Sequence, residues 1–219
     1  AVLTAGDHAI TAQYSGDGSF NGSASTSITH TVSRAEAAVS ITSAPAPSVF
    51  GQPIAITATI TASAPGAGVP GGVVTFYNNG VSLGSAVLSN GAASINTGGF
   101  AVGAQPITAT YGGDANFNPA AGAATHTVHK ADTTTIVVDH APGPSVFGQT
   151  ATFTAAVSVN APGAGTPTGS VAFFADGNPI GVGALSGGAA SIESAVLTAG
   201  DHAITAQYSG DGSFNGSAS

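Results

Sequence analysis

Three acidic turns carry the residues of this sequence that are best placed to bind a metal ion. In each turn, oxygen-bearing side chains stand at alternate positions, as they do in the first half of a calcium-binding loop. The turns hold Asp17, Ser19 and Asn21; Asp114, Asn116 and Asn118; and Asp211, Ser213 and Asn215. Calcium is therefore the one candidate cofactor, with no other cofactor expected.

The same turns also fit a purely structural role. A calcium loop of this type ends in a bidentate acid at its twelfth position, and Ile28 stands there in the first turn. Asp and Asn favour hairpin turns because their side chains hydrogen-bond the backbone two residues further on. On this alternative, the aromatic residue that follows each acid fills a hydrophobic core, and these residues are Phe20, Phe117 and Phe214.

Histidines beside acids are the second arrangement with chemical potential. Asp7-His8 and Asp201-His202 could be two members of a hydrolytic triad, but the equivalent residues between them are Ala104-Gln105. The sequence also contains no G-x-S-x-G nucleophile turn. We therefore expect no catalytic residues and no enzyme, and we assign these histidines to strand ends.

His126 and His129 lie three residues apart in a predicted strand. Side chains alternate between the two faces of a strand, so residues three apart point to opposite sides. The two histidines are therefore not expected to bind one metal ion.

Composition excludes several classes of partner. Only 5% of the 219 residues are charged, with 2 basic against 10 acidic residues and a net charge of -8. No basic surface is available for phosphates, so we expect no nucleic-acid binding. Apolar runs are interrupted well before the ~18 residues of a membrane span, so no membrane insertion is expected. Cysteine is absent, which excludes disulfides and thiolate chemistry.

Internal repetition organises the whole chain. The motif SVFGQ at 48–52 recurs at 145–149, a spacing of 97 residues, and residues 1–25 recur letter for letter as 195–219. A basic-Ala-acidic joint falls once per repeat and includes the only two basic residues, Arg34 and Lys130. These joints predict three parts: the C-terminal portion of one domain (1–35), a complete domain (36–131) and a domain without its last strand (132–219).

Apolar residues recur with a period of two, which predicts strands. In 52–61, isoleucines and alanine alternate with a threonine-rich face, and turn pairs such as Asn79-Gly80 and Asp176-Gly177 separate the strands. About seven short strands in ~97 residues are typical of an immunoglobulin-like sandwich. The predicted fold is all-β, with tandem immunoglobulin-like β-sandwich domains.

A family resemblance agrees with this fold. P-S-V-F-G-Q is followed by P-x-G-x-V-x-F at 167–173, a D-G or N-G turn, and then G-x-H-x-I-x-A-x-Y-x-G-D-x-x-F. This succession resembles the bacterial Ig-like (Big) domains found in tandem on surface proteins. The middle repeat departs from it at Pro70-Gly71-Gly72 and at Gln105. The resemblance implies an extracellular or cell-surface bacterial protein with a stalk-like or adhesin-like role.

Two functions fit these observations. The first is a structural segment of an extracellular fibre, stalk or filament, whose partners are neighbouring repeats or subunits of the same protein. The alternative is an adhesin module that binds a glycan or host receptor, although its Gly-, Ala- and Pro-rich loops have few of the aromatic and arginine anchors that dominate interfaces.

The incomplete last domain leaves two forms of the structural function open. The chain could be part of a much longer repetitive protein. If it is instead a whole subunit, a neighbouring chain could donate the final strand. The donated residues would be Thr26, Ile28, Thr29, His30 and Val32.

Overall fold

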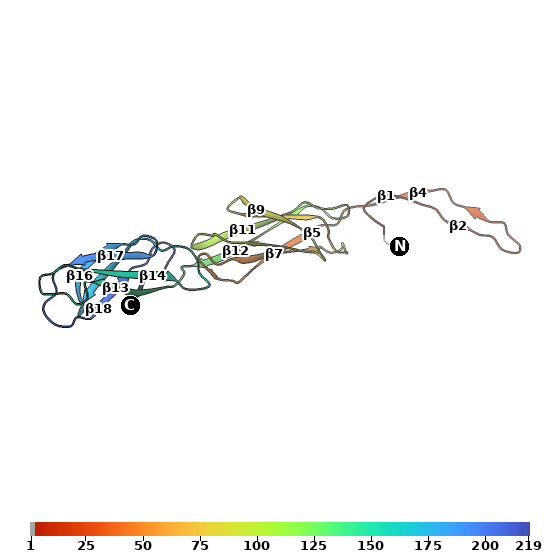
Figure 1. Cartoon of the computed structure of the whole chain (residues 1–219). Helices are drawn as coiled ribbons and strands as arrows, with labels where there is room; N and C mark the ends of the chain where they lie inside the picture. Colours follow the sequence, from red (N-terminus) through yellow and green to blue (C-terminus); the bar gives the residue numbers. More distant parts are fainter. Residues whose placement is uncertain (1–2) are drawn as a thin grey trace. The chain divides into compact units, whose positions relative to one another are not determined.

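The computed structural model describes residues 3–219, and every regular element in that range is a β-strand (Figure 1). The prediction of an all-β chain is therefore confirmed for the described residues. Contacts divide them into two compact units. The first contains residues up to Thr42, Ile56–Ile95 and Pro106–Ala124, and the second contains Ser43–Ala55, Asn96–Gln105 and Thr125–Ser219.

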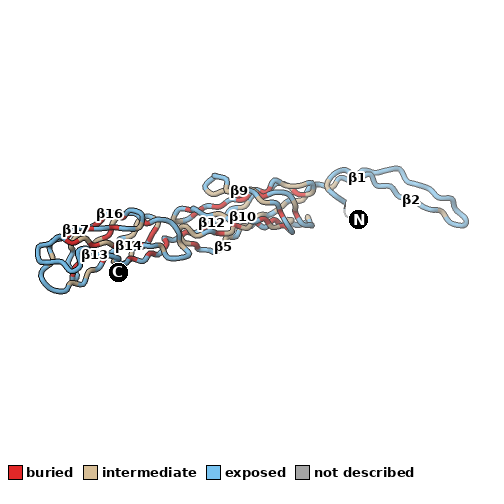
Figure 2. Tube along the Cα trace, in the orientation of Figure 1, coloured by how far each residue is buried: buried red, intermediate tan, exposed pale blue. Residues whose placement is uncertain are grey.

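The N-terminal segment (residues 3–35) is built of paired strands with little burial. Its strands are β1 (Gly6–Ile10), β2 (Gln13–Tyr14), β3 (Ser23–Ala24) and β4 (Ile28–Val32). β1 pairs with β4 and β2 pairs with β3, both antiparallel. Nearly all of the segment is coloured as exposed in Figure 2. Its apolar residues therefore have no core around them.

The middle repeat (residues 36–131) supplies two sheets. One has the strand order β10-β7-β5 and the other β6-β12-β11-β8-β9. The strands are β5 (Ala37–Ala44), β6 (Ser48–Val49), β7 (Ile54–Ala62), β8 (Val73–Asn78), β9 (Val81–Val87), β10 (Ala92–Thr97), β11 (Gly103–Tyr111) and β12 (Ala120–His129). In β7, Ile54, Ile56 and Ile60 are buried while Thr59 and Thr61 are exposed, as the period of two predicts.

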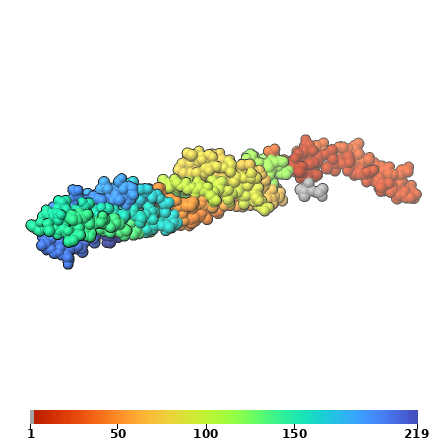
Figure 3. Space-filling model, in the orientation of Figure 1, coloured from red at the N-terminus to blue at the C-terminus, as the bar shows by residue number. Residues whose placement is uncertain are grey.

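The last repeat (residues 132–219) lies wholly within the second unit. Its sheets have the orders β13-β14-β17 and β16-β15-β18-β19. The strands are β13 (Thr133–Ala141), β14 (Ala151–Val159), β15 (Ser170–Ala175), β16 (Asn178–Ala184), β17 (Ala189–Ser194), β18 (Ile204–Tyr208) and β19 (Ser217–Ala218). Figure 3 shows these residues, coloured from green to blue, as one closely packed body.

The core of the last repeat comes from the inward faces of both sheets. Phe153 of β14, Phe173 of β15 and Tyr208 of β18 belong to one buried cluster, which Phe214 joins from the turn before β19. Burying side chains of this size stabilises a domain by roughly 1.5–3 kcal/mol each, so the sandwich needs no disulfide.

The predicted turns occur where the sequence placed them. Asn79-Gly80 joins β8 to β9 and Asp176-Gly177 joins β15 to β16, and all four residues have positive φ. Two-residue hairpins of this kind require left-handed backbone at both central positions, which Asn, Asp and Gly adopt most easily. These turns set the register of both hairpins.

Candidate functional site

The acidic turn of the middle repeat is a hydrogen-bonded Asx turn. Asp114 Oδ1 accepts the amides of Asn116 and Phe117 at 2.7 and 2.9 Å, and Oδ2 accepts the Gly71 amide at 2.8 Å. Burial on its own would raise the pKa of Asp114, but these bonds and the neighbouring Tyr111 hydroxyl hold that pKa below its usual range. The carboxylate thus joins its own turn to the loop that precedes β8.

Asp211 has the same role in the last repeat, with one more donor. Its Oδ1 accepts the amides of Ser213 and Phe214, while Oδ2 accepts both the amide and the hydroxyl of Thr168 at 2.9 and 2.7 Å. Burial opposes ionisation here too, but the four donated bonds outweigh it and lower the pKa of Asp211 to about 2. Burial and the charge of Asp211 raise the pKa of the adjacent Tyr208 to about 12.

The first acidic turn makes the same hydrogen bonds within the turn, but its aromatic residue does not pack into a core. Asp17 Oδ1 accepts the Ser19 and Phe20 amides, and Tyr14 donates to Oδ2 at 2.9 Å. Phe20, however, is 67% exposed, whereas its counterparts Phe117 and Phe214 are buried. The expectation that all three aromatic residues fill a core is therefore not met by Phe20, because the two-stranded sheets β1-β4 and β2-β3 of the described N-terminal segment bury none of its residues.

Two asparagines of these turns, Asn118 and Asn215, bond to the acidic residues of the joints between repeats. Asn118 donates to Glu36 Oε1 at 2.7 Å, and Asn215 donates to Asp132 Oδ1 at 2.8 Å. Asn116 Oδ1 accepts the Ala5 amide. Asn21 lies in the exposed first turn. Within the described residues, no three His, Asp or Glu side chains gather as a metal site would require.

The histidines of the Asp-His pairs close short loops. His202 Nδ1 lies 2.6 Å from Asp176 Oδ2, and Nε2 lies 3.0 Å from the Thr198 carbonyl. The bond to Asp176, followed by the bond to Thr198, raises the pKa of His202. In the middle repeat, Gln105 instead donates to the Ala101 carbonyl at 2.8 Å. A glutamine thus spans the same four-residue loop in this repeat.

His126 is the most enclosed histidine of the described chain. It is 1% exposed, with Nδ1 2.9 Å from Ser43 Oγ and Nε2 2.8 Å from Ser48 Oγ. Its ring also lies against Phe100. Burial lowers the pKa of His126, because water no longer stabilises the protonated ring. His129, three residues on, is exposed, so the two rings do lie on opposite faces.

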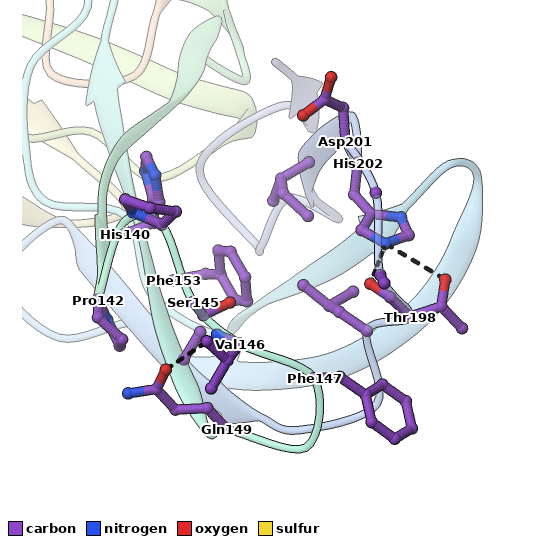
Figure 4. Close-up of a pocket in the computed structure, with 16 residues that line it drawn as sticks. His140, Pro142, Ser145, Val146, Phe147, Gln149, Phe153, Thr198, Asp201 and His202 are labelled. Atoms are coloured by element: carbon purple, nitrogen blue, oxygen red, sulfur yellow. Dashed lines mark hydrogen bonds between the residues drawn. The ribbon is translucent and has the colours of Figure 1, made fainter.

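The last repeat has a groove at the corresponding place (Figure 4). Its volume is about 720 Å³, and its walls include the counterparts of the His126 neighbours, namely His140 for Ser43, Ser145 for Ser48 and Leu197 for Phe100. Phe147 at its rim is 78% exposed and Val146 is 73% exposed. The groove is therefore accessible, with apolar side chains at its rim and a mixed polar and apolar lining.

A well-defined junction joins the SVFGQ loop of the middle repeat to the last repeat. The Phe50 ring meets Phe214 edge to face with centroids 5.4 Å apart, and the Ala164 amide donates to the Phe50 carbonyl at 3.2 Å. Gly51 lies so close to Ala164 that a Cβ atom there would stand 2.2 Å from its carbonyl oxygen. The loop requires a glycine at this position.

The joint itself is bonded to the last repeat. The Ala131 amide donates to the Ser213 carbonyl, and the Asn215 amide donates to the Ala131 carbonyl at 2.8 Å. Lys130 Nζ donates to the Asp211 carbonyl. Ala131 is fully buried. The joint is therefore part of the folded repeat.

The residues named as a possible donated strand are available in this structure. Ile28–Val32 form β4, and Thr26 precedes it. Val32 is half-buried, and the other named residues are exposed to solvent. Sequence reasoning did not identify Phe50, Gly51 or His126 as contact residues. The recurrence of SVFGQ was visible, but its contacts depend on residues more than 75 positions away.

The middle and last repeats are therefore tandem β-sandwich domains, and the joint between them is hydrogen-bonded to the last repeat. The chain belongs to the bacterial Ig-like domain (group 3) family, which matches residues 41–129 and 138–219. The predicted family and immunoglobulin-like fold are thereby confirmed. No curated protein matches the chain.

Several solved structures are similar to it. The fibronectin(III)-like modules of Clostridium thermocellum CbhA share 22% identity over 83% of this chain and 92% of theirs, with a TM-score of 0.32. A structure from a 1.5-MDa bacterial ice-binding adhesin shares 18% identity over 93% of this chain and 69% of its own, with a TM-score of 0.36. The mouse nectin-like molecule 4 ectodomain shares 11% identity over 87% and 66%, with a TM-score of 0.32.

Proposed function

We propose that this chain is a structural segment of an extracellular fibre, stalk or filament made of end-to-end Ig-like domains on a bacterial cell surface. The junction of the SVFGQ loop with the last repeat is the observation that carries the proposal. Three contacts join the loop to the last repeat: the Phe50 ring against Phe214, the hydrogen bond from the Ala164 amide to the Phe50 carbonyl, and the close approach of Gly51 to Ala164. Such contacts resist bending at the joint, as an array of domains under tension requires.

The joint adds to this resistance. Ala131 is bonded on both sides to the turn that carries Phe214, and the neighbouring lysine is bonded to the same turn. A linker of this kind has little free length, unlike the Gly/Ser-rich linkers that let domains move independently. Subunits of such a fibre are joined either by covalent continuation of the repeats or by strand donation.

Surface chemistry is also consistent with a fibre outside the cell. With 5% charged residues, lateral contacts between neighbours remove few charges from water. The described residues include no helix of the length and apolarity needed to cross a bilayer. Ig-like domains of this family are generally not enzymes, and we assign the segment no catalytic step.

The proposal is tested on the organism that makes the protein. An antibody raised against this chain, used for immunogold labelling of intact cells, should mark extended material at the cell surface with a regular axial spacing. Labelling confined to the cell interior would contradict the proposal. Specific glycan or receptor binding by the isolated chain would favour the adhesin alternative.

A further inference from the structure

His126 is bonded to the first residue of the loop that makes the junction. Its Nε2 atom lies 2.8 Å from Ser48 Oγ, and Ser48 begins both β6 and the SVFGQ loop (48–52). Its Nδ1 atom lies 2.9 Å from Ser43 Oγ of β5, and the Phe100 ring lies beside the imidazole with centroids 6.1 Å apart. The side chain is 1% exposed. The segment that carries the junction therefore also helps to keep water from this ring.

The same strand holds the loop through its backbone. β12 and β6 pair in parallel, with Val128 opposite Ser48 and His129 opposite Val49, and the Phe50 amide donates to the His129 carbonyl at 2.8 Å. β6 is only two residues long, and it lies at the edge of its five-stranded sheet. Local opening is cheapest where few bonds are broken. β6 can therefore detach from β12 while the other strands of the sheet stay paired.

The elements around His126 offer no negative charge. β5, residues 45–52 and residues 96–103 contain no ionisable side chain. The whole middle repeat has two carboxylates, Glu36 and Asp114. Both accept hydrogen bonds at the acidic turn that precedes β12, whereas His126 lies near the end of that strand. No acid of the middle repeat is therefore placed to balance a proton on the ring.

The ionisable groups of β12 and of its neighbour β11 do not supply a counter-charge either. His129 is exposed and lies on the opposite face of β12. Lys130, directly after this strand, is positive and donates to the Asp211 carbonyl. On β11, Tyr111 lies beside Asp114, at the acidic turn. Burial is the cause that lowers the pKa of His126, so the site favours the neutral ring.

Two serine hydroxyls suit a neutral imidazole. A hydroxyl can donate to the unprotonated nitrogen and another can accept from the N–H, so both ring atoms are satisfied. Protonation of His126 would bury a full charge without a partner, which is costly in an apolar interior. Detaching β6 takes Ser48 away from Nε2 and admits water to the ring. Opening at this edge therefore solvates the charge and leaves the remaining strands in place.

We propose that protonation of His126 releases the SVFGQ loop, so that mild acid opens the junction between the middle and last repeats. Phe50 and Gly51 follow β6 directly, so they move with it when it leaves β12. The Phe50 ring then loses Phe214, and its carbonyl loses the Ala164 amide. The inference rests on the proposed end-to-end array and adds its regulation: the joint is braced at neutral pH and free to bend in acid.

The direction of the pH dependence follows from the two states of the loop. With the loop closed, burial lowers the pKa of His126, and with the loop open the ring returns to its ordinary pKa of about 6.5. The open state then binds the proton more readily, so falling pH favours opening below about 6.5. The opening equilibrium should rise by up to about tenfold per pH unit, until the pH falls below the closed-state pKa. Above about pH 7 the loop should stay closed.

The first test follows amide hydrogen exchange of the full chain by NMR between pH 7.5 and pH 5, with rates corrected for the intrinsic effect of pH. Protection of the Phe50 and Ala164 amides should fall by at least about tenfold in the wild type. In His126→Gln, which does not titrate, it should change by less than about twofold. His129→Gln is the matched control on the same strand and should respond as the wild type does. Equal responses of the wild type and His126→Gln would overturn the proposal.

The second test separates release of the loop from unfolding of the repeat, and it needs only the wild type. Ile60 is a buried core residue whose amide donates to the Gly91 carbonyl, so it reports on opening of the core. The Phe50 and Ala164 amides should be at least about tenfold less protected than the Ile60 amide at every pH. Equal protection of all three would mean that the loop opens only when the repeat unfolds. A loss of protection that begins only below about pH 4.5, where carboxylates titrate, would also contradict a role for His126.

Failure of this inference and failure of the proposed function give different results. Protection that does not depend on pH, together with surface labelling, would remove the acid-driven release and leave the fibre standing. Intracellular labelling with pH-dependent protection would instead remove the extracellular role and leave the release of the loop standing.

Discussion

At the scale of single residues, one carboxylate organises each acidic turn. Asp17, Asp114 and Asp211 all accept two amides from the residues that follow. Only Asp114 and Asp211 also accept a donor from a loop 43 residues earlier in sequence. The same short motif is therefore a local turn in one place and a tertiary contact in the other two.

Replacing Asp211 by asparagine should destabilise the last repeat by about 1–2 kcal/mol, because charge-assisted bonds to two segments are weakened. Asp17→Asn is the matched control within an identical sequence, and its effect should stay within about 0.5 kcal/mol because that turn is exposed. Urea unfolding of both variants measures the difference. Equal losses would show that the Thr168 bonds contribute nothing.

Calcium removal addresses the metal hypothesis for the same turns. The carboxylate oxygens of Asp114 and Asp211 already accept amide or hydroxyl protons, and an ion would have to displace these donors. We therefore expect chelator treatment to change the melting temperature of the chain by less than about 2 °C. A large decrease, restored by calcium and not by magnesium, would establish a calcium site.

His126 should make the fold sensitive to mild acid. The pKa of His126 is lowered in the folded state, whereas the pKa of a histidine in the unfolded chain is about 6.5. As the pH is lowered below that value, the unfolded chain binds more protons than the folded one, so the free energy of unfolding decreases. Between about pH 7 and pH 5, the wild type should therefore lose more stability than His126→Gln. The raised pKa of His202 acts in the opposite direction, and it cancels in this comparison because both proteins retain it.

At the scale of elements, sequence periodicity was sufficient for the strands and their turns. The alternation in β7 and the Asn79-Gly80 turn are local patterns, and both occur as predicted. Periodicity could not predict that Phe214 is buried and Phe20 exposed, because the two residues stand in identical sequences. What differs is the packing: Phe214 joins the core cluster of the last repeat, whereas the described N-terminal segment has no buried residue, and no local pattern contains that information.

The SVFGQ loop allows the junction to be tested with a matched pair of glycines. Gly51 and Gly148 have φ of 79° and 80°, but only Gly51 has another residue within reach of an added Cβ. Gly148→Ala should cost about 1 kcal/mol of backbone strain. Gly51→Ala should add about 1–3 kcal/mol from overpacking against Ala164.

Nuclear magnetic resonance provides a second measurement for this pair. The edge-to-face contact of Phe50 with Phe214 produces ring-current shifts in both rings. These shifts should be lost in Gly51→Ala and retained in Gly148→Ala. Retention in both variants would mean that the loop contact does not depend on the close approach at Gly51.

At the scale of the whole molecule, the few positive charges mark the joints. Arg34 and Lys130 are the only basic residues, so trypsin has two possible sites, one at each joint. The residues that follow both are bonded in the same way: Ala35 to Asn116 and Asn118, and Ala131 to Ser213 and Asn215. The strands that precede them differ, because the end of β12 is buried while β4 is exposed.

Limited trypsin digestion should therefore cut Arg34 well before Lys130. A protease needs a locally unfolded segment around the bond, and β4 can open without disturbing a core, whereas opening β12 exposes His126 and Val128. Mass spectrometry of dilute samples should show residues 35–219 as the first stable product, and Arg34→Gln should remain intact. Faster cleavage at Lys130 would contradict the view that the buried end of β12 secures its joint.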